Sequence, residues 1–238
     1  MQRIRKKIHA IAEDSSFFDD ATLKRDNIIL LISIILFGFI MPIVRIDIIR
    51  DWGFDILISV LILSCITSLK FKKEKFIKLS YMSLFTLALV WLNHFLEIPE
   101  TKLISFALLT MFLIYITYSM IKYVSISKDV NSIMLLNAIN SYLLIGIIGS
   151  FLFISIDVAY VNYFDSQHAI NFNNIAKPLF HDYVYYSFVT LTTLGFGDIT
   201  PNMPIAKSLT VSLSLIGQLY LTILVAMLVG KYSSQLKD

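Results

Sequence analysis

Long stretches without a charged side chain recur along the chain and indicate how it is organised. A helix needs about 20 predominantly apolar residues to cross the roughly 30 Å hydrocarbon core of a bilayer. Five uncharged stretches of 18 to 27 residues approach or exceed that length. We therefore expect a membrane span in each of them: 27–44, 79–96, 103–121, 130–156 and 208–230.

Two shorter apolar stretches need separate treatment. Residues 56–69 number only 14, and they form a span if Trp52, Phe54 and Asp55 lie in the interface, where Trp is a common anchor. The alternative is a re-entrant helix or one on the membrane surface. Residues 183–197 are too short, and too rich in Gly and Thr at their end, to cross. The prediction is an all-α membrane protein with six transmembrane helices and one half-span.

The basic residues support this count. With the N-terminus in the cytoplasm, 15 Lys and Arg residues fall on the cytoplasmic side and 5 on the other, as the positive-inside rule requires. Five spans would put the C-terminal lysines on the wrong side. We therefore expect a multi-pass protein of the cell membrane with both termini cytoplasmic.

Composition agrees with membrane insertion and excludes other classes. The chain is 57% hydrophobic and 16% charged with a mean hydropathy of +0.74, whereas soluble domains are about 45–50% apolar and 25% charged. The single Cys65 excludes an intrachain disulfide. The four histidines form no zinc motif, and no nucleophile–base pair or phosphate loop indicates an enzyme. We expect neither a cofactor nor a nucleic-acid partner.

The order of the spans predicts three regions. Residues 1–26 form a basic cytoplasmic segment, either a short helix on the inner leaflet or a frayed tail. Residues 27–123 form a four-helix bundle, and residues 124–238 form an outer helix, the half-span and an inner helix. Only seven residues follow Lys231, so we expect no nucleotide-binding domain there.

The half-span carries the most informative pattern. An apolar, aromatic stretch begins after Asp182, an expected N-cap, and runs to about Thr192; Gly195 and Gly197 follow at alternate positions. Glycine adopts positive φ without steric cost, so alternate glycines allow successive carbonyls to face one side. A column of carbonyls can replace the water shell of a cation.

The segment Thr190–Asp198, T-L-T-T-L-G-F-G-D, resembles the selectivity filter of potassium channels, most often written T-V-G-Y-G. The resemblance extends over about residues 131–230 as helix, half-helix and helix. It implies a homotetramer in a lipid bilayer, with K⁺ as the permeant ion. The implied ion sites use the Thr193 hydroxyl and the carbonyls of Thr193, Leu194, Gly195 and Phe196, with Gly197 at the outer mouth.

The same resemblance implies supporting roles around the filter. Thr192, Tyr185, Tyr186 and Asp198 stand at the supporting positions, and we expect a hydrogen bond between Tyr185 and Asp198. Two positions depart from the usual pattern. Leu194 replaces Val or Ile, and Phe196 replaces Tyr, which removes a hydroxyl that commonly bonds to the pore helix.

The inner helix contains candidates for a hinge and a gate. Gly217 stands where the family places a hinge glycine, although a close packing contact explains it nearly as well. Gln218, the only amide in this span, is expected to face the cavity or protein because an amide facing lipid is costly. An apolar stripe below it is the predicted gate: Leu221, Val225 and Leu228.

Other features limit the mechanism. The fourth span contains no Lys or Arg, so we expect no intrinsic voltage sensor.

The connection Lys122–Val130 is nine residues long, which favours packing of each four-helix bundle against the outer and inner helices of its own chain. Small residues and asparagines of the fifth span are expected to make helix contacts: Gly146, Gly149, Ser150, Asn131, Asn137 and Asn140.

Charged groups near the outer side suggest two further features. The region from Asp157 to Pro204 contains four acidic residues but only one basic residue, Lys177, and the excess of negative charge is expected to concentrate cations before the filter. The four acids are Asp157, Asp165, Asp182 and Asp198. His94 and Glu97 are expected as an interfacial pair, with titration near neutral pH as the alternative.

The function predicted from the sequence is K⁺-selective conduction. The alternatives are a weakly selective cation channel and a non-conducting membrane sensor or scaffold that retains a pore module. The sequence does not decide whether a separate regulatory protein binds.

Overall fold

The structure is a computed structural model that describes residues 20–40, 47–69, 73–96, 99–127, 129–164, 168–173 and 178–235. Within these ranges its regular secondary structure is helical except for one two-residue strand pair. The seven α-helices are α2 (Asp20–Ile35), α3 (Asp47–Thr67), α4 (Lys73–Leu96), α5 (Pro99–Ile126), α6 (Ser132–Ala159), α7 (Phe180–Leu191) and α8 (Pro204–Gln235). Single π-turns continue α2 as Leu36–Ile40 and α6 as Tyr160–Phe164, and β1 (Ile170–Asn171) pairs antiparallel with β2 (Thr200–Pro201).

Four helical stretches of the described chain are long and apolar enough to cross a membrane: Glu74–Phe95, Glu100–Ile126, Ser132–Phe164 and Pro204–Gln235. They coincide with four of the expected spans. The apolar part of α3, Trp52–Thr67, is shorter. The helix α2 begins seven residues earlier than the expected span and includes the charged residues Lys24, Arg25 and Asp26, so it is not among the four.

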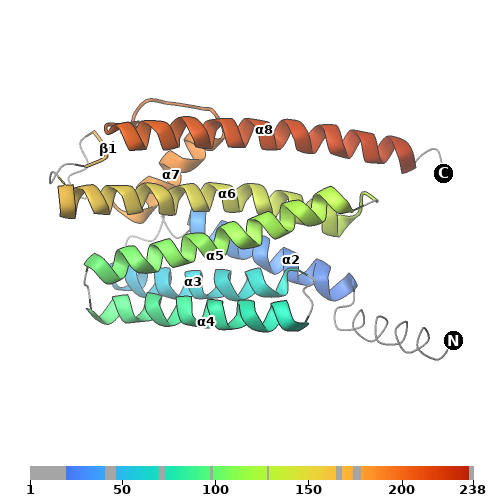
Figure 1. Ribbon diagram of the computed structural model, residues 1–238, viewed down its shortest axis with the longest axis horizontal. Coiled ribbons are helices and arrows are strands. Elements are labelled where there is room, and N and C mark those ends of the chain that lie inside the picture. Colours follow the sequence, from blue (N-terminus) through green and yellow to red (C-terminus); the bar gives the residue numbers. More distant parts are fainter. Residues whose placement is uncertain are drawn as a thin grey trace.

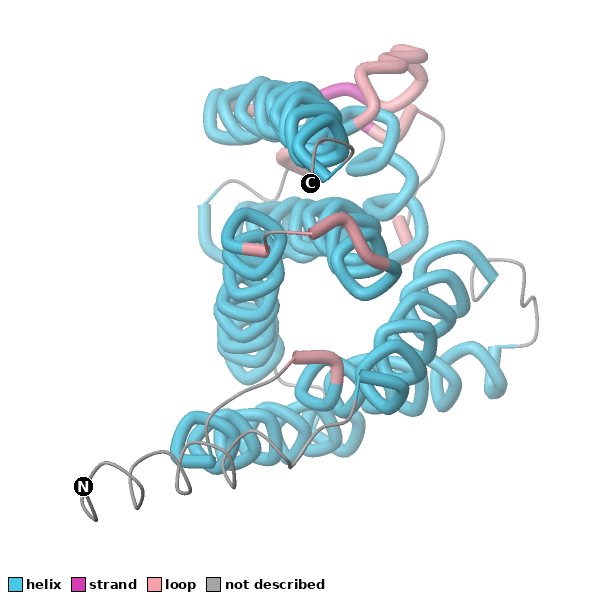
Figure 2. The backbone as a smooth tube through the Cα atoms, turned by 90° about the vertical axis from the view of Figure 1, so that its right-hand side faces the viewer, coloured by secondary structure: helices cyan, strands magenta, loops and turns pink. Residues whose placement is uncertain are grey.

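The helices lie side by side with α8 at one edge and α4 at the opposite edge (Figure 1). Figure 2 looks along the bundle from the end where α8 finishes, and shows α8 separated from α3 and α4 by the helices between them. The start of α2 and the end of α8 lie at the same end (Figure 1). This agrees with an even number of crossings between them.

The four-helix bundle packs against residues 124–238 of the same chain, as the short connection after α5 predicts. The helices α5 and α2 both contact α6 extensively. One core cluster joins the two regions: Phe37 after α2, Phe112 on α5 and Phe151 on α6 are each at most 1% exposed. The predicted boundary near residue 124 is therefore not a break in the core.

Polar contacts among the helices differ partly from those predicted. Asn140 of α6 donates to the Asn27 carbonyl of α2 at 3.0 Å, which confirms an interhelical bond for this residue. Asn137 instead donates to Ile133 of its own helix, and Asn131 caps α6. His94 pairs with Asp55 of α3, with Nδ1 and Oδ2 2.7 Å apart; Glu97 lies outside the described residues.

Candidate functional site

The helix α7 is held close to α6 by glycines. An added Cβ on Gly146 would lie 2.5 Å from the Phe188 ring, and one on Gly149 would overlap the Ser187 hydroxyl. Ser187 donates to the Gly146 carbonyl at 2.6 Å, so the backbones approach closely enough for a direct bond. The small-residue contact expected of Gly146 and Gly149 is confirmed.

The start of α7 lies three residues earlier than predicted. Its N-cap is Leu179, and Asp182 occupies the third helical position, where its carboxylate accepts the Leu179 amide at 2.7 Å. Asp182 as N-cap is therefore wrong. A carboxylate in the first turn still satisfies a free amide and complements the helix dipole.

The chain turns sharply where α7 ends. Thr192 is the C-cap, and its hydroxyl donates to the Phe188 carbonyl at 2.6 Å. The amides of Leu194 and Gly195 both point back to the Val189 carbonyl, at 3.0 and 3.4 Å. We call Thr193–Gly197 the filter-like segment because of its resemblance to the filter pattern. The last turn of α7 thus holds the first half of this segment through the amides of Leu194 and Gly195.

Backbone conformation alternates along this segment. Gly195 and Gly197 have φ of +57° and +76°, as their spacing predicts. Thr193 also has positive φ, at +60°, which the sequence did not indicate because a β-branched residue is seldom found there. Leu194 and Phe196 are not among the positive-φ residues. The alternation therefore covers Thr193 to Gly197.

The carbonyls of this segment are available to a ligand. Within the described part of the chain, no hydrogen bond ends on the carbonyl oxygens of Thr193 to Gly197. The segment is also exposed, with Leu194 at 60% and Phe196 at 65%, and nothing lies within 4 Å of a Cβ built on either glycine. Such backbone survives at membrane depth only where protein surrounds it or it lines water.

The predicted bond between Tyr185 and Asp198 is present. The Tyr185 hydroxyl donates to Asp198 Oδ2 at 2.6 Å, and this bond lowers the pKa of Asp198. The Asn173 side chain donates to the Asp198 carbonyl. Asp198 is thereby joined to α7 and to the loop that precedes it.

Tyr186 points elsewhere. Its hydroxyl lies 2.6 Å from the Thr210 hydroxyl of α8, so in this structure it joins α7 to α8. Its ring packs against Phe153 of α6.

A buried carboxylate is the main group that the sequence analysis misplaced. Asp157 is 2% exposed and accepts hydrogen bonds from Tyr183 at 2.6 Å, from the Ala169 amide at 2.6 Å and from His168 at 2.7 Å. It therefore ties the end of α6 to α7 and to the loop before β1 instead of adding charge to the mouth. Asp165 and Lys177 lie outside the described residues. The only signal in the sequence was a lone acid ending a 27-residue uncharged stretch.

The helix α8 passes through Gly217 without interruption. A Cβ there would overlap the carbonyl oxygen of Leu191, the last residue of α7, and would lie 2.8 Å from the Leu191 side chain. This close approach of two backbones supports the packing interpretation of Gly217.

The predicted stripe on α8 is not exposed along its whole length. Gln218, Leu221 and Val225 are exposed, but Leu228 packs partly against Val124 and its neighbours. Four exposed residues recur at intervals of three and four, which places them on one helix face: Gln218, Thr222, Val225 and Val229.

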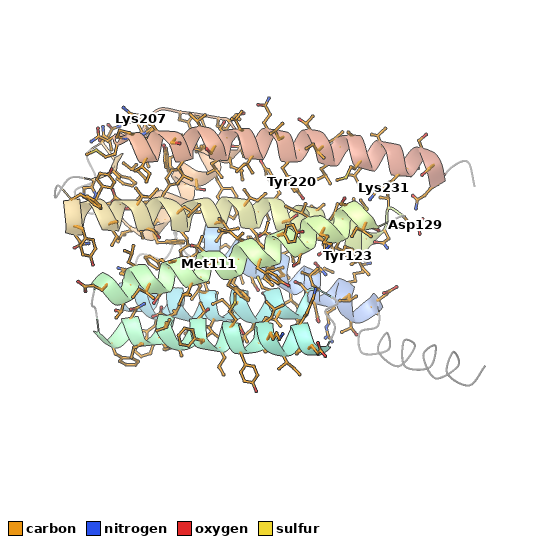
Figure 3. All side chains as sticks on the ribbon, in the orientation of Figure 1. Met111, Tyr123, Asp129, Lys207, Tyr220 and Lys231 are labelled. Atoms are coloured by element: carbon orange, nitrogen blue, oxygen red, sulfur yellow. The ribbon has the colours of Figure 1, made fainter. Side chains whose placement is uncertain are left out.

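Two further contacts hold α8, and neither was predicted (Figure 3). The Tyr220 hydroxyl donates to the Ala138 carbonyl of α6 at 2.7 Å. Lys231 Nζ donates to the carbonyls of Val124 and Ser125, at 2.6 and 3.2 Å. These carbonyls belong to the last turn of α5, where a cation is favoured by the helix dipole.

Comparison with known proteins bears on this region. Residues 141–233 match the model of a family described as "Ion channel", and this range contains α7, the segment that follows it and nearly all of α8. No curated protein and no solved structure matches the chain. The chain therefore contains an ion channel domain together with apolar helices suited to a multi-pass membrane protein.

Proposed function

We propose that the protein is a K⁺-selective channel in which the segment Thr193–Gly197 of four chains surrounds one ion path. The observation that carries this proposal is the alternating backbone of that segment, with carbonyls that no described group engages. Dehydrated K⁺ binds to rings of such carbonyls. The Thr193 hydroxyl and the carbonyls of Thr193, Leu194, Gly195 and Phe196 are the proposed ligands, with Gly197 at the mouth.

Several chains are needed to complete such a path. One chain supplies a single strand of carbonyls, and every residue from Thr192 to Asp198 is exposed in that chain. The helix α8 is the least buried of the four apolar helices that could cross a membrane. A homotetramer would cover both surfaces, with α8 nearest the axis.

Six crossings with cytoplasmic termini remain part of the proposal. The placement of the ends of α2 and α8 on one side supports it (Figure 1). In this arrangement α5 is the fourth crossing, and its apolar part, from Leu103 to Ile121, has no basic residue to move in a membrane field. Conduction is then not intrinsically voltage-gated.

The test is ion flux into liposomes that contain the purified protein and a K⁺ gradient. Gly195→Ala places a Cβ at φ +57°, which a non-glycine residue adopts at a cost of about 1–3 kcal/mol. We expect this variant to lose K⁺ flux or K⁺ selectivity. Gly230→Ala is the control, because open space surrounds that Cβ.

The outcomes separate the alternatives. Flux with equal rates for K⁺ and Na⁺ in the wild type would favour a weakly selective channel, consistent with Phe196 at the position usual for Tyr. No flux from a correctly assembled protein would favour a non-conducting scaffold. A Gly195→Ala variant that conducts as the wild type does would refute the filter assignment.

A further inference from the structure

A cavity of about 440 Å³ opens where α3 ends and α4 begins. It lies between the end of α3, the first turn of α4 and the last three turns of α5. Its volume is in the range of small-ligand sites. Its lining includes Leu69, Lys75, Tyr118, Lys122 and Tyr123.

The charge of the cavity is positive. Lys75 of α4 and Lys122 of α5 both line it, and among the residues that the structure describes no Asp or Glu does. Neither lysine forms an ion pair with a carboxylate of the described residues. Lys231 lies at the same end (Figure 3), but the carbonyls of Val124 and Ser125 already engage its ammonium group. The free positive charge therefore comes from two different helices that face one cavity.

An exposed apolar track leads away from the cavity along α5. Ile104, Met111 and Tyr118 are 55%, 65% and 61% exposed, and their seven-residue spacing places them on one helix face. Met111 lies on α5 toward the end opposite Tyr123 (Figure 3). A soluble phosphate compound would contact only the basic end of this surface, whereas a phospholipid would contact both parts.

We propose that this cavity binds the phosphate headgroup of an anionic membrane phospholipid. Lys75 and Lys122 contact the phosphate, and the acyl chains lie along the exposed α5 track. Lysine side chains near helix ends place their charge at headgroup level while their methylene stems stay on apolar surface. The proposal rests on insertion in a membrane and not on conduction or on its selectivity.

Binding is measured by native mass spectrometry of the detergent-purified protein titrated with dioleoyl phosphatidylglycerol. Dioleoyl phosphatidylcholine and glycerol 3-phosphate are titrated in parallel. Lys75→Gln and Lys122→Gln are each expected to weaken phosphatidylglycerol binding about fivefold, the effect of one basic residue at an anionic surface. Lys75→Arg and Lys122→Arg retain the charge and should retain binding.

Lys78→Gln is the matched control, because Lys78 is exposed on the same helix but does not line the cavity. We expect this variant to change the affinity for phosphatidylglycerol less than about twofold. This limit is well below the roughly fivefold effect expected at a lysine that lines the cavity. The proposal is overturned if Lys78→Gln weakens binding as much as Lys75→Gln does, or if phosphatidylcholine binds as tightly as phosphatidylglycerol. Equal affinity for glycerol 3-phosphate would show a free phosphate ligand instead of a lipid. No ion flux enters the measurement, so its failure leaves the proposed function intact.

Discussion

Replacing Gly217 by alanine tests how the inner helix meets the end of α7. The new methyl group would overlap the Leu191 carbonyl oxygen and lie 2.8 Å from the Leu191 side chain. The first of these neighbours is backbone, which cannot rotate away, so α7 or α8 must shift. Overpacking of this kind costs about 1–3 kcal/mol. Leu191 is two residues from Thr193, so the shift would reach the filter-like segment.

A second glycine on the same helix isolates that cost. Gly230→Ala has nothing within 4 Å of its new Cβ, and both substitutions gain the same helix propensity of about 0.5–1 kcal/mol. The difference between the two variants is therefore the packing term alone. At roughly 2–4 °C per kcal/mol for a chain of this size, we expect Gly217→Ala to melt about 2–12 °C below Gly230→Ala.

The assay is the apparent melting temperature of the purified protein in one detergent, at equal concentration for both variants. K⁺ flux into liposomes gives the second readout, and we expect it to fall only for Gly217→Ala. Equal melting temperatures would show that α8 does not approach Leu191 as described. In that case a hinge would become the better explanation of Gly217.

Three further experiments test individual contacts. Tyr185→Phe removes the bond that lowers the pKa of Asp198; because a lowered pKa keeps the carboxylate charged to lower pH, the acid limb of the flux–pH profile should move to higher pH, and an unchanged profile would refute this role. Lys231→Met removes the contacts to Val124 and Ser125 and should speed hydrogen–deuterium exchange at the end of α8, whereas Lys207→Met at its start should not. Val225 is 58% exposed and Leu228 packs against the Val124 cluster, so Val225→Asp should raise open probability with the fold intact while Leu228→Asp should destabilise it; equal effects would show that Leu228 is no more packed than Val225.

The positions of the long helices could be predicted from the spacing of the charged residues, because uncharged stretches of this length are typical of membrane-spanning helices. Positive φ at Gly195 and Gly197 followed equally well, since few other patterns require alternate glycines. Thr193 could not be predicted, because its positive φ depends on bonds from neighbouring amides to α7 and not on its own preference. Burial of Asp157 depends on three partners from 11 to 26 residues away. No local pattern in the sequence brings such groups together.

The central claim is that Thr193–Gly197 of four chains conduct K⁺ in preference to Na⁺. The most direct measurement is the reversal potential of the purified protein in a planar bilayer with KCl on one side and NaCl on the other. We expect the wild-type current to reverse far toward the K⁺ equilibrium potential, and we expect this displacement to be lost in Gly195→Ala. A wild-type current that reverses near 0 mV, the value expected when neither cation is preferred, would contradict it.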